Sequence, residues 1–294
     1  MSDPASPKAW ANFLVRAWGP NFPVQVRTIA LDYSKRFADP ILKIAEAEVS
    51  NFEGAIYFRP KKEEKPDRWF ILYNPSIESI GRRNFTIAHE FGHYLNHRSL
   101  IRRTKDASLE CSQKSVLGID SDAAKIIERE ADEFASYLLM PMNDFRQQIA
   151  GQPMNVDLLS HCVDRYEVSW TAAASKWIEF TEERAVLVVA IDGFVLWSRR
   201  STAAEKSYMF FKRGMPLPDL SVAAKGPSVE NLSLGTELPG GIWHREPVRE
   251  ITIFADKYDL TISLLIFNRH PQYAPLEDAE PDADLVDIME KRQA

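Results

Sequence analysis

The sequence predicts an α+β protein: a small N-terminal domain of helices packed on a short β-sheet, then a helical segment, then a mainly β module. Two long helical periodicities, over about 82–97 and 123–140, and two strand-like stretches before the first of them predict the N-terminal domain. The β module is predicted by apolar runs that flank Asp192-Gly193, a dipeptide suited to a tight hairpin turn. The expected parts are the N-terminal domain (1–150), the helical segment (151–183), the β module (184–270) and an acidic tail (271–294).

Length and composition exclude several classes of protein. A chain of 294 residues has room for two or three small units. The formal net charge is −6 and no long window is basic, so direct nucleic-acid binding is not expected. The cysteines, Cys111 and Cys162, are too few for a disulfide framework. No apolar run approaches a membrane span and the N-terminus lacks a secretory pattern, so we expect a cytoplasmic protein without membrane contact.

The elements of the N-terminal half follow from apolar spacing and turn residues. We expect a short helix within residues 1–20 and an amphipathic helix over Val24–Phe37. Glu53–Phe58 and Trp69–Tyr73 have strand character, and the charged residues between them predict a solvated turn. The polar stretch 99–122 predicts an irregular connection between the two long helices.

The C-terminal half changes from helical to β patterning. Residues 157–180 predict two short helices around Tyr166-Glu167-Val168-Ser169. The hairpin is expected to join strands at 185–191 and 194–197. Further strands are expected at 208–211, 249–254 and 260–267. The tail from Pro271 is rich in Asp and Glu, and we expect it to be disordered.

The segment His89-Glu90-Phe91-Gly92-His93 lies in the middle of the first long helix. Residues four apart on an α-helix differ by about 40° of rotation and roughly 6 Å of rise, so both imidazoles lean toward one point. A zinc ion about 2 Å from each nitrogen fits there. Glu90 stands beside this face, where it can act as general base on a water. Gly92 is expected to leave open space beside the metal.

His97 continues the four-residue spacing, but it cannot be the third ligand on a straight helix. Eight residues rise about 12 Å, whereas the ligand nitrogens of one zinc lie within roughly 3–4 Å of each other. The metzincin pattern would need a histidine at position 99, which is Ser99. We interpret His97 as a helix-end residue at the rim of the site.

The third ligand is expected from the acidic helix over about 123–140. On a helical wheel Glu128 lies about 60° from the middle of the apolar stripe, closer than Glu130 and Asp132 at about 100°. A carboxylate near a packed face needs a partner, because burying unpaired charge is unfavourable. We predict Glu128 as the ligand, with an ordinary boundary glutamate as the open alternative. Asp132 is expected to accept a hydrogen bond from a ligating histidine, whereas Glu130 and Glu133 are interpreted as solvated.

Two stretches together resemble the ImmA/IrrE family of metallo-endopeptidases. Both are longer than the five-residue histidine motif, so the pair is far more specific than that motif alone. The likeness covers about residues 20–180 and rests on Arg82–His97, on Glu128–Ala135 continuing into Leu138-Leu139-Met140-Pro141, and on the strand-like Gly54-Ala55-Ile56 and Trp69–Asn74.

The resemblance implies a small zincin-like (gluzincin-like) metallopeptidase core, with zinc held by His89, His93 and the glutamate matching Glu128. Glu90 matches the catalytic glutamate of the family. Manganese is an alternative metal, and the residues do not decide between the two.

The resemblance also implies a protein substrate, typically a helix-turn-helix repressor, in a stress-response or mobile-element switch. The helical segment is expected to be helix-turn-helix-like. The β module past about Ala185 departs from the minimal family form and is expected to be sensory or regulatory. An open strand edge within 52–59 or 67–74 is expected to pair with an extended substrate.

Two other functions stay open. The first is a DNA-binding regulator that uses residues 155–180, although acidic side chains outnumber basic ones there. The second is a non-catalytic protein-interaction regulator in which zinc supports the fold. Cys111 would then close the site as a fourth ligand, since structural zinc sites normally have four.

Overall fold

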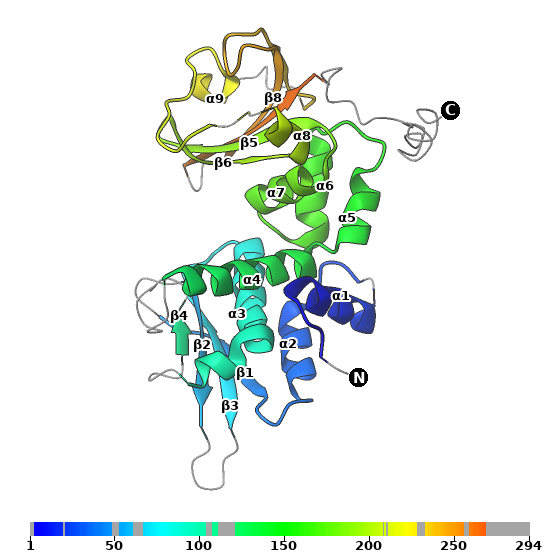
Figure 1. Ribbon diagram of the computed structural model, residues 1–294, viewed down its shortest axis with the longest axis vertical. Helices are drawn as coiled ribbons and strands as arrows, with labels where there is room; N and C mark the ends of the chain where they lie inside the picture. Colours follow the sequence, from blue (N-terminus) through cyan, green and yellow to red (C-terminus); the bar gives the residue numbers. More distant parts are fainter. Residues whose placement is uncertain are drawn as a thin grey trace, which may run out of the picture. The chain divides into compact units, whose positions relative to one another are not determined.

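The computed structural model describes residues 3–19, 21–48, 53–60, 67–103, 108–110, 121–207, 209, 211–227, 233–255 and 259–268. The chain forms two compact units, Met1–Phe180 and Thr181–Ala294 (Figure 1). The predicted α+β class is confirmed: the first unit combines helices with a short sheet, and the second is mainly β. The finer division at residues 150 and 183 stays a prediction, and the tail from Pro271 lies outside the described residues.

The first unit contains a four-stranded mixed sheet and several helices (Figure 1). In the sheet order β1-β3-β2-β4, β1 runs parallel to β3, and β2 is antiparallel to both of its neighbours. The strands are β1 (Ile41–Glu46), β2 (Gly54–Arg59), β3 (Arg68–Tyr73) and β4 (Ser108–Glu110). The helices are α1 (Pro7–Trp18), α2 (Val26–Ser34), α3 (Ile80–Ile101), α4 (Ser121–Leu139), α5 (Met142–Ile149), α6 (Val156–Tyr166) and α7 (Trp170–Phe180).

Helix α3 is the central element of this unit, because it packs on β2 and β3 on one side and on α4 on another. Its N-terminus is capped by Ser79, whose side chain accepts a hydrogen bond from the Arg82 amide. Asp39, which precedes β1, joins the sheet to this helix: it accepts from Trp69 Nε1 at 2.9 Å, and its carbonyl accepts from the Tyr94 hydroxyl at 3.0 Å. These buried bonds fix the helix against the sheet.

Two expectations for the first unit are wrong. The stretch 99–122 is not wholly irregular, because α3 continues to Ile101 and β4 pairs with β2 at residues 55–57. Neither β2 nor β3 offers a fully open edge: β3 lies between β1 and β2, and β2 is paired on both sides at residues 55–57. Pairing between strands far apart in sequence is not visible in local patterns, which explains why β4 and the paired edge of β2 were not predicted.

The second unit is a five-stranded antiparallel sheet in the order β6-β5-β9-β8-β7. Asp192 and Gly193 both have positive φ, 51° and 78°, so the predicted hairpin turn is confirmed. The strand expected at 208–211 is not formed at Met209 or Phe211, the two of its residues that are described. The elements are β5 (Arg184–Ile191), β6 (Phe194–Arg200), α8 (Thr202–Lys206), α9 (Val222–Lys225), β7 (Thr236–Leu238), β8 (Val248–Ala255) and β9 (Leu260–Phe267).

A buried carboxylate on β8 forms hydrogen bonds with several elements of the second unit. Glu250 is 1% exposed and accepts hydrogen bonds from groups on several elements. The donors are the amides of Val222 and Ala223 at 2.9 and 3.0 Å, Trp243 Nε1 at 2.9 Å, and the hydroxyls of Thr252 and Ser263 at 3.0 and 3.2 Å. The carboxylate is therefore fully engaged as an acceptor. Within the described residues, no helix combines the length and the apolar character needed to cross a bilayer.

Candidate metal centre

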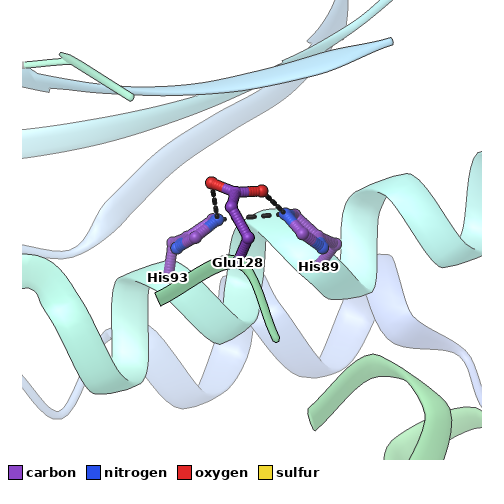
Figure 2. A group of neighbouring side chains, drawn as sticks. All are labelled: His89, His93 and Glu128. Atoms are coloured by element: carbon purple, nitrogen blue, oxygen red, sulfur yellow. Dashed lines mark hydrogen bonds and ion pairs between the residues drawn. The ribbon is translucent and has the colours of Figure 1, made fainter. Parts of the chain in front are cut away.

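The structure brings together the three side chains that the sequence predicts as ligands. His89 and His93 lie one turn apart on α3, with their Nε2 atoms 3.0 Å from each other. Glu128 reaches over them from α4, with Oε2 at 3.3 Å from His89 Nε2 and Oε1 at 3.6 Å from His93 Nε2. Figure 2 shows one carboxylate oxygen directed to each imidazole. The donor atoms of the three residues thus surround a common point.

These distances are close to those between ligands on one metal ion. Ligands about 2.05 Å from a zinc ion and separated by the tetrahedral angle lie about 3.3 Å from each other. The two Nε2 atoms are 3.0 Å apart, and a different oxygen of Glu128 lies near each of them, at 3.3 Å from His89 and 3.6 Å from His93. Within the described part of the chain, these three residues form the group whose donor atoms all lie within 4.8 Å of one another. Two histidines and a carboxylate are also the donor set of one class of catalytic zinc sites. The cluster can therefore hold a metal ion.

Asp132 lies where the sequence places it, one helical turn after Glu128. Its Oδ1 atom is 2.8 Å from His89 Nδ1. Because a carboxylate only accepts hydrogen bonds, His89 carries a proton on Nδ1, and in the neutral imidazole the lone pair of Nε2 then faces Glu128 and His93. This is the tautomer that a metal ligand requires, and carboxylate–histidine pairs of this kind orient metal ligands in many sites.

The interpretations of His97 and Glu130 are wrong. His97 is 7% exposed and is not at a rim: its Nδ1 lies 3.1 Å from His93 Nδ1. Its Nε2 lies 2.8 Å from Glu130 Oε2, so Glu130 is not simply a solvated side chain. One sequence signal could have indicated this contact, because a residue four positions after His93 faces the same side of the helix.

Burial keeps the histidines next to the cluster neutral. His93 is fully buried, and desolvation together with the neighbouring His89 and His97 holds its pKa well below the ordinary value. Burial also lowers the pKa of His97, although the hydrogen bond to Glu130 acts in the opposite direction. A neutral imidazole has a free lone pair, so both effects favour metal ligation over repulsion of a cation.

Glu90 is fully buried between α3 and β2. The close approach of the strand depends on Gly54: a Cβ added there would lie 2.4 Å from Thr86 Cγ2 and 2.9 Å from Glu90 Oε1. Glycine therefore lets the β2 backbone pass directly over the glutamate of the motif. Sequence reasoning did not single out Gly54 for this role.

The role expected for Gly92 is wrong. It does not leave space beside the metal, because it faces α4: an added Cβ would come within 3.0 Å of Phe134 Cδ1 and 3.3 Å of Ala131 Cα. The lack of a side chain allows α3 and α4 to approach closely. That approach places Glu128 within reach of the two histidines, so Gly92 supports the site through helix packing.

The turn between α6 and α7 also contacts the N-terminal part of α3. Helices α6 and α7 are joined at Glu167, which has φ 48° and ψ 54°. The next residue, Val168, lies so close to Gly81 that an added Cβ would be 2.6 Å from its carbonyl carbon. The basic residue of α7, Lys176, is 1% exposed, with Nζ 3.5 Å from the ring centroid of Tyr137. It is not presented to a phosphate, so α7 gives no support to the DNA-binding alternative. Cys111, proposed to close a structural site, lies outside the described residues.

The first unit is thus an α+β domain in which two histidines of one helix and a glutamate of another face a common point, and these residue types are the donor set of one class of catalytic zinc sites. Residues 43–177 match a peptidase family described as the IrrE N-terminal-like domain. This match confirms that this part of the chain resembles the ImmA/IrrE family.

Among solved structures, the chain is similar to a Mycobacterium tuberculosis transcriptional regulator, with 12% sequence identity and a TM-score of 0.54. The match covers 92% of this chain and 91% of that chain. At this low identity the likeness concerns the fold alone. A comparison with curated protein sequences gave no match.

Proposed function

We propose that this protein is a zinc-dependent endopeptidase that hydrolyses a peptide bond in a protein substrate. The single observation that carries the proposal is the convergence of His89, His93 and Glu128, whose donor atoms lie within 4.8 Å of one another. Membership of residues 43–177 in a peptidase family supports it. Among the described residues three side chains converge, and three protein ligands are typical of catalytic zinc sites.

Each residue has a defined task in this mechanism. His89 and His93 would hold the metal through Nε2 and Glu128 through its carboxylate, and a zinc ion bound there would supply the Lewis acid that amide hydrolysis requires. Glu90, buried on the same helix, takes the proton from the attacking water and delivers it to the leaving amine. Asp132 holds the proton of His89 on Nδ1, away from the metal-facing nitrogen.

The finer parts of the proposal rest on the family. The substrate is a helix-turn-helix repressor, cleaved in the cytoplasm as part of a stress-response or mobile-element switch. Zinc is the expected metal and manganese the alternative. The protein acts on the repressor itself, so no direct contact with nucleic acid or with a membrane is expected.

The test is to incubate the metal-loaded protein with candidate helix-turn-helix repressors and to look for one discrete cut. We expect Glu90→Gln to bind metal with unchanged affinity and to cleave at least about 100-fold more slowly, because general-base catalysis contributes factors of about 10²–10⁴. Metal content measured on the same samples separates loss of chemistry from loss of the ion. Cleavage by Glu90→Gln at the rate of the unmodified protein would show that the assigned base is wrong.

A further inference from the structure

The two histidines predicted as ligands differ in the hydrogen-bond partner of their Nδ1 atoms, which point away from the cluster. The Nδ1 atom of His89 contacts a carboxylate directly, Asp132 at 2.8 Å. The Nδ1 atom of His93 instead contacts a second imidazole, His97 at 3.1 Å, and that imidazole contacts Glu130 at 2.8 Å. A chain of two hydrogen bonds thus runs from Glu130 on α4 through His97 to His93 on α3.

The carboxylate of Glu130, at the end of this chain, determines which atom donates in each of the two hydrogen bonds. A carboxylate accepts and does not donate, so His97 donates its proton to Glu130 from Nε2. A neutral imidazole has one N–H, and His97 Nδ1 is then a bare acceptor. The partner of that acceptor, His93 Nδ1, must supply the proton of their shared bond. The remaining nitrogen of His93, Nε2, is left with its lone pair toward His89 and Glu128.

The opposite arrangement would disable the ligand. If His97 carried its proton on Nδ1, it would donate to His93 Nδ1, and His93 would hold its own proton on Nε2. A protonated Nε2 has no lone pair for a metal. The carboxylate of Glu130 therefore determines which of the two arrangements forms, although two hydrogen bonds separate it from His93.

We propose that His97 and Glu130 are positioning residues for the metal, which together keep the proton of His93 on Nδ1 and its Nε2 lone pair in the cluster. The proposal rests on the metal-binding part of the proposed function, and it adds two residues that act through His93. It predicts that neither residue touches the metal or the substrate, and that both set the affinity for the metal.

The first measurement uses the unmodified, zinc-loaded full chain. Nitrogen-15 NMR of the histidine rings should show His97 with its proton on Nε2 and a bare Nδ1. In Glu130→Ala, with nothing to accept from Nε2, the His97 signals should shift toward the other tautomer. A proton found on His97 Nδ1 in the unmodified protein would overturn the proposal without any variant.

The second measurement is zinc affinity by competition with a chromophoric chelator. Glu130→Ala and His97→Leu should each weaken zinc binding by about 10-fold to 100-fold, as is typical for groups that orient a metal ligand. The matched control is Glu133→Ala: Glu133 lies on the same helix with a similarly exposed side chain, 37% against 40%, but it pairs with Lys8. Its zinc affinity should stay unchanged.

A rescue and a double variant separate proton positioning from simple charge. The carbonyl oxygen of Asn can take the place of His97 Nδ1 as an acceptor, so His97→Asn should restore most of the affinity lost in His97→Leu. Adding Glu130→Ala to His97→Asn should then cost nothing further, because the link between them is gone. An undiminished loss in that background would show that Glu130 acts only through its charge, and the proposal would fail. An unmodified protein that binds no zinc would instead refute the proposed function itself.

Discussion

The Glu128 cluster of α3 and α4 and the Glu250 cluster of the second unit both gather polar groups, but with opposite hydrogen-bonding character. Around Glu250 the carboxylate meets N–H and O–H donors from α9, Trp243, β8 and β9, and each oxygen is matched. Around Glu128 the carboxylate meets two nitrogen atoms whose protons are held elsewhere, on the Nδ1 side of each ring. Lone pairs face lone pairs there.

The difference distinguishes a structural polar cluster from a binding site. Matched donors and acceptors stabilise a fold, because every buried polar group has a partner. Converging acceptors repel one another and gain from a cation placed among them. The contrast predicts that changes at Glu128 weaken metal binding with little effect on stability. Changes at Glu250 should lower stability with little effect on metal binding.

The largest expected effect is at Glu128. Glu128→Gln removes the charged ligand, so zinc affinity should fall by more than the roughly 100-fold that outer positions produce. The metal-free protein should unfold at the same denaturant concentration as the unmodified one or at a higher concentration, because the NH₂ group of Gln relieves repulsion among the acceptors of the cluster. Chelator competition and equilibrium unfolding measure the two quantities. Unchanged zinc affinity in Glu128→Gln would remove Glu128 from the site.

The second prediction concerns Glu250, the carboxylate whose hydrogen bonds are all matched. Glu250→Gln replaces one acceptor oxygen by an NH₂ donor that faces other donors, so the second unit should lose about 2 kcal/mol of stability. Amide hydrogen exchange in β8 and β9 should report the loss, while zinc affinity stays unchanged. Glu237→Gln on β7 is the control, since that side chain is exposed. If Glu250→Gln weakened zinc binding as much as it weakened the fold, the two clusters could not be treated as independent.

Local spacing explains which parts of the metal site could be predicted from the sequence. His89, Glu90 and His93 share one helix, and the period of that helix fixes their relation. Glu128 could be identified because a carboxylate beside an apolar stripe needs a partner. The contact between His97 and Glu130 was missed because each residue was judged on its own helix, and only the crossing of α3 and α4 joins them.

The same reasoning applies to the folds of the two units. Strand character and the Asp192-Gly193 turn are local and were predicted, whereas β4 and the order of the strands depend on pairing between distant segments. The burial of Glu250 could have been predicted from the alternation of side chains along a strand, because Glu250 shares a strand face with Val248 and Thr252, which are both buried. Its donors come from segments up to 28 positions away, and no local pattern brings them together.

The smallest expected effect tests the backbone that passes over the metal motif. Gly54→Ala places a Cβ 2.4 Å from Thr86 Cγ2 and 2.9 Å from Glu90 Oε1, so the strand or the glutamate must shift by a fraction of an ångström. A displaced general base loses efficiency, and we expect cleavage to slow by about 10-fold. The zinc affinity of Gly54→Ala should change little, because the atoms closest to the added Cβ belong to Thr86 and Glu90 and not to the three residues predicted as ligands.

A second substitution shows whether the clash is the cause. Thr86→Ser removes the Cγ2 atom that lies closest to the added Cβ and keeps the hydroxyl that donates to the Arg82 carbonyl at 3.0 Å. In the Gly54→Ala background it should restore part of the cleavage rate, while alone it should have little effect. If Gly54→Ala cleaved at the normal rate, β2 would not set the position of Glu90, and the support of the catalytic glutamate would have to come from α3 alone.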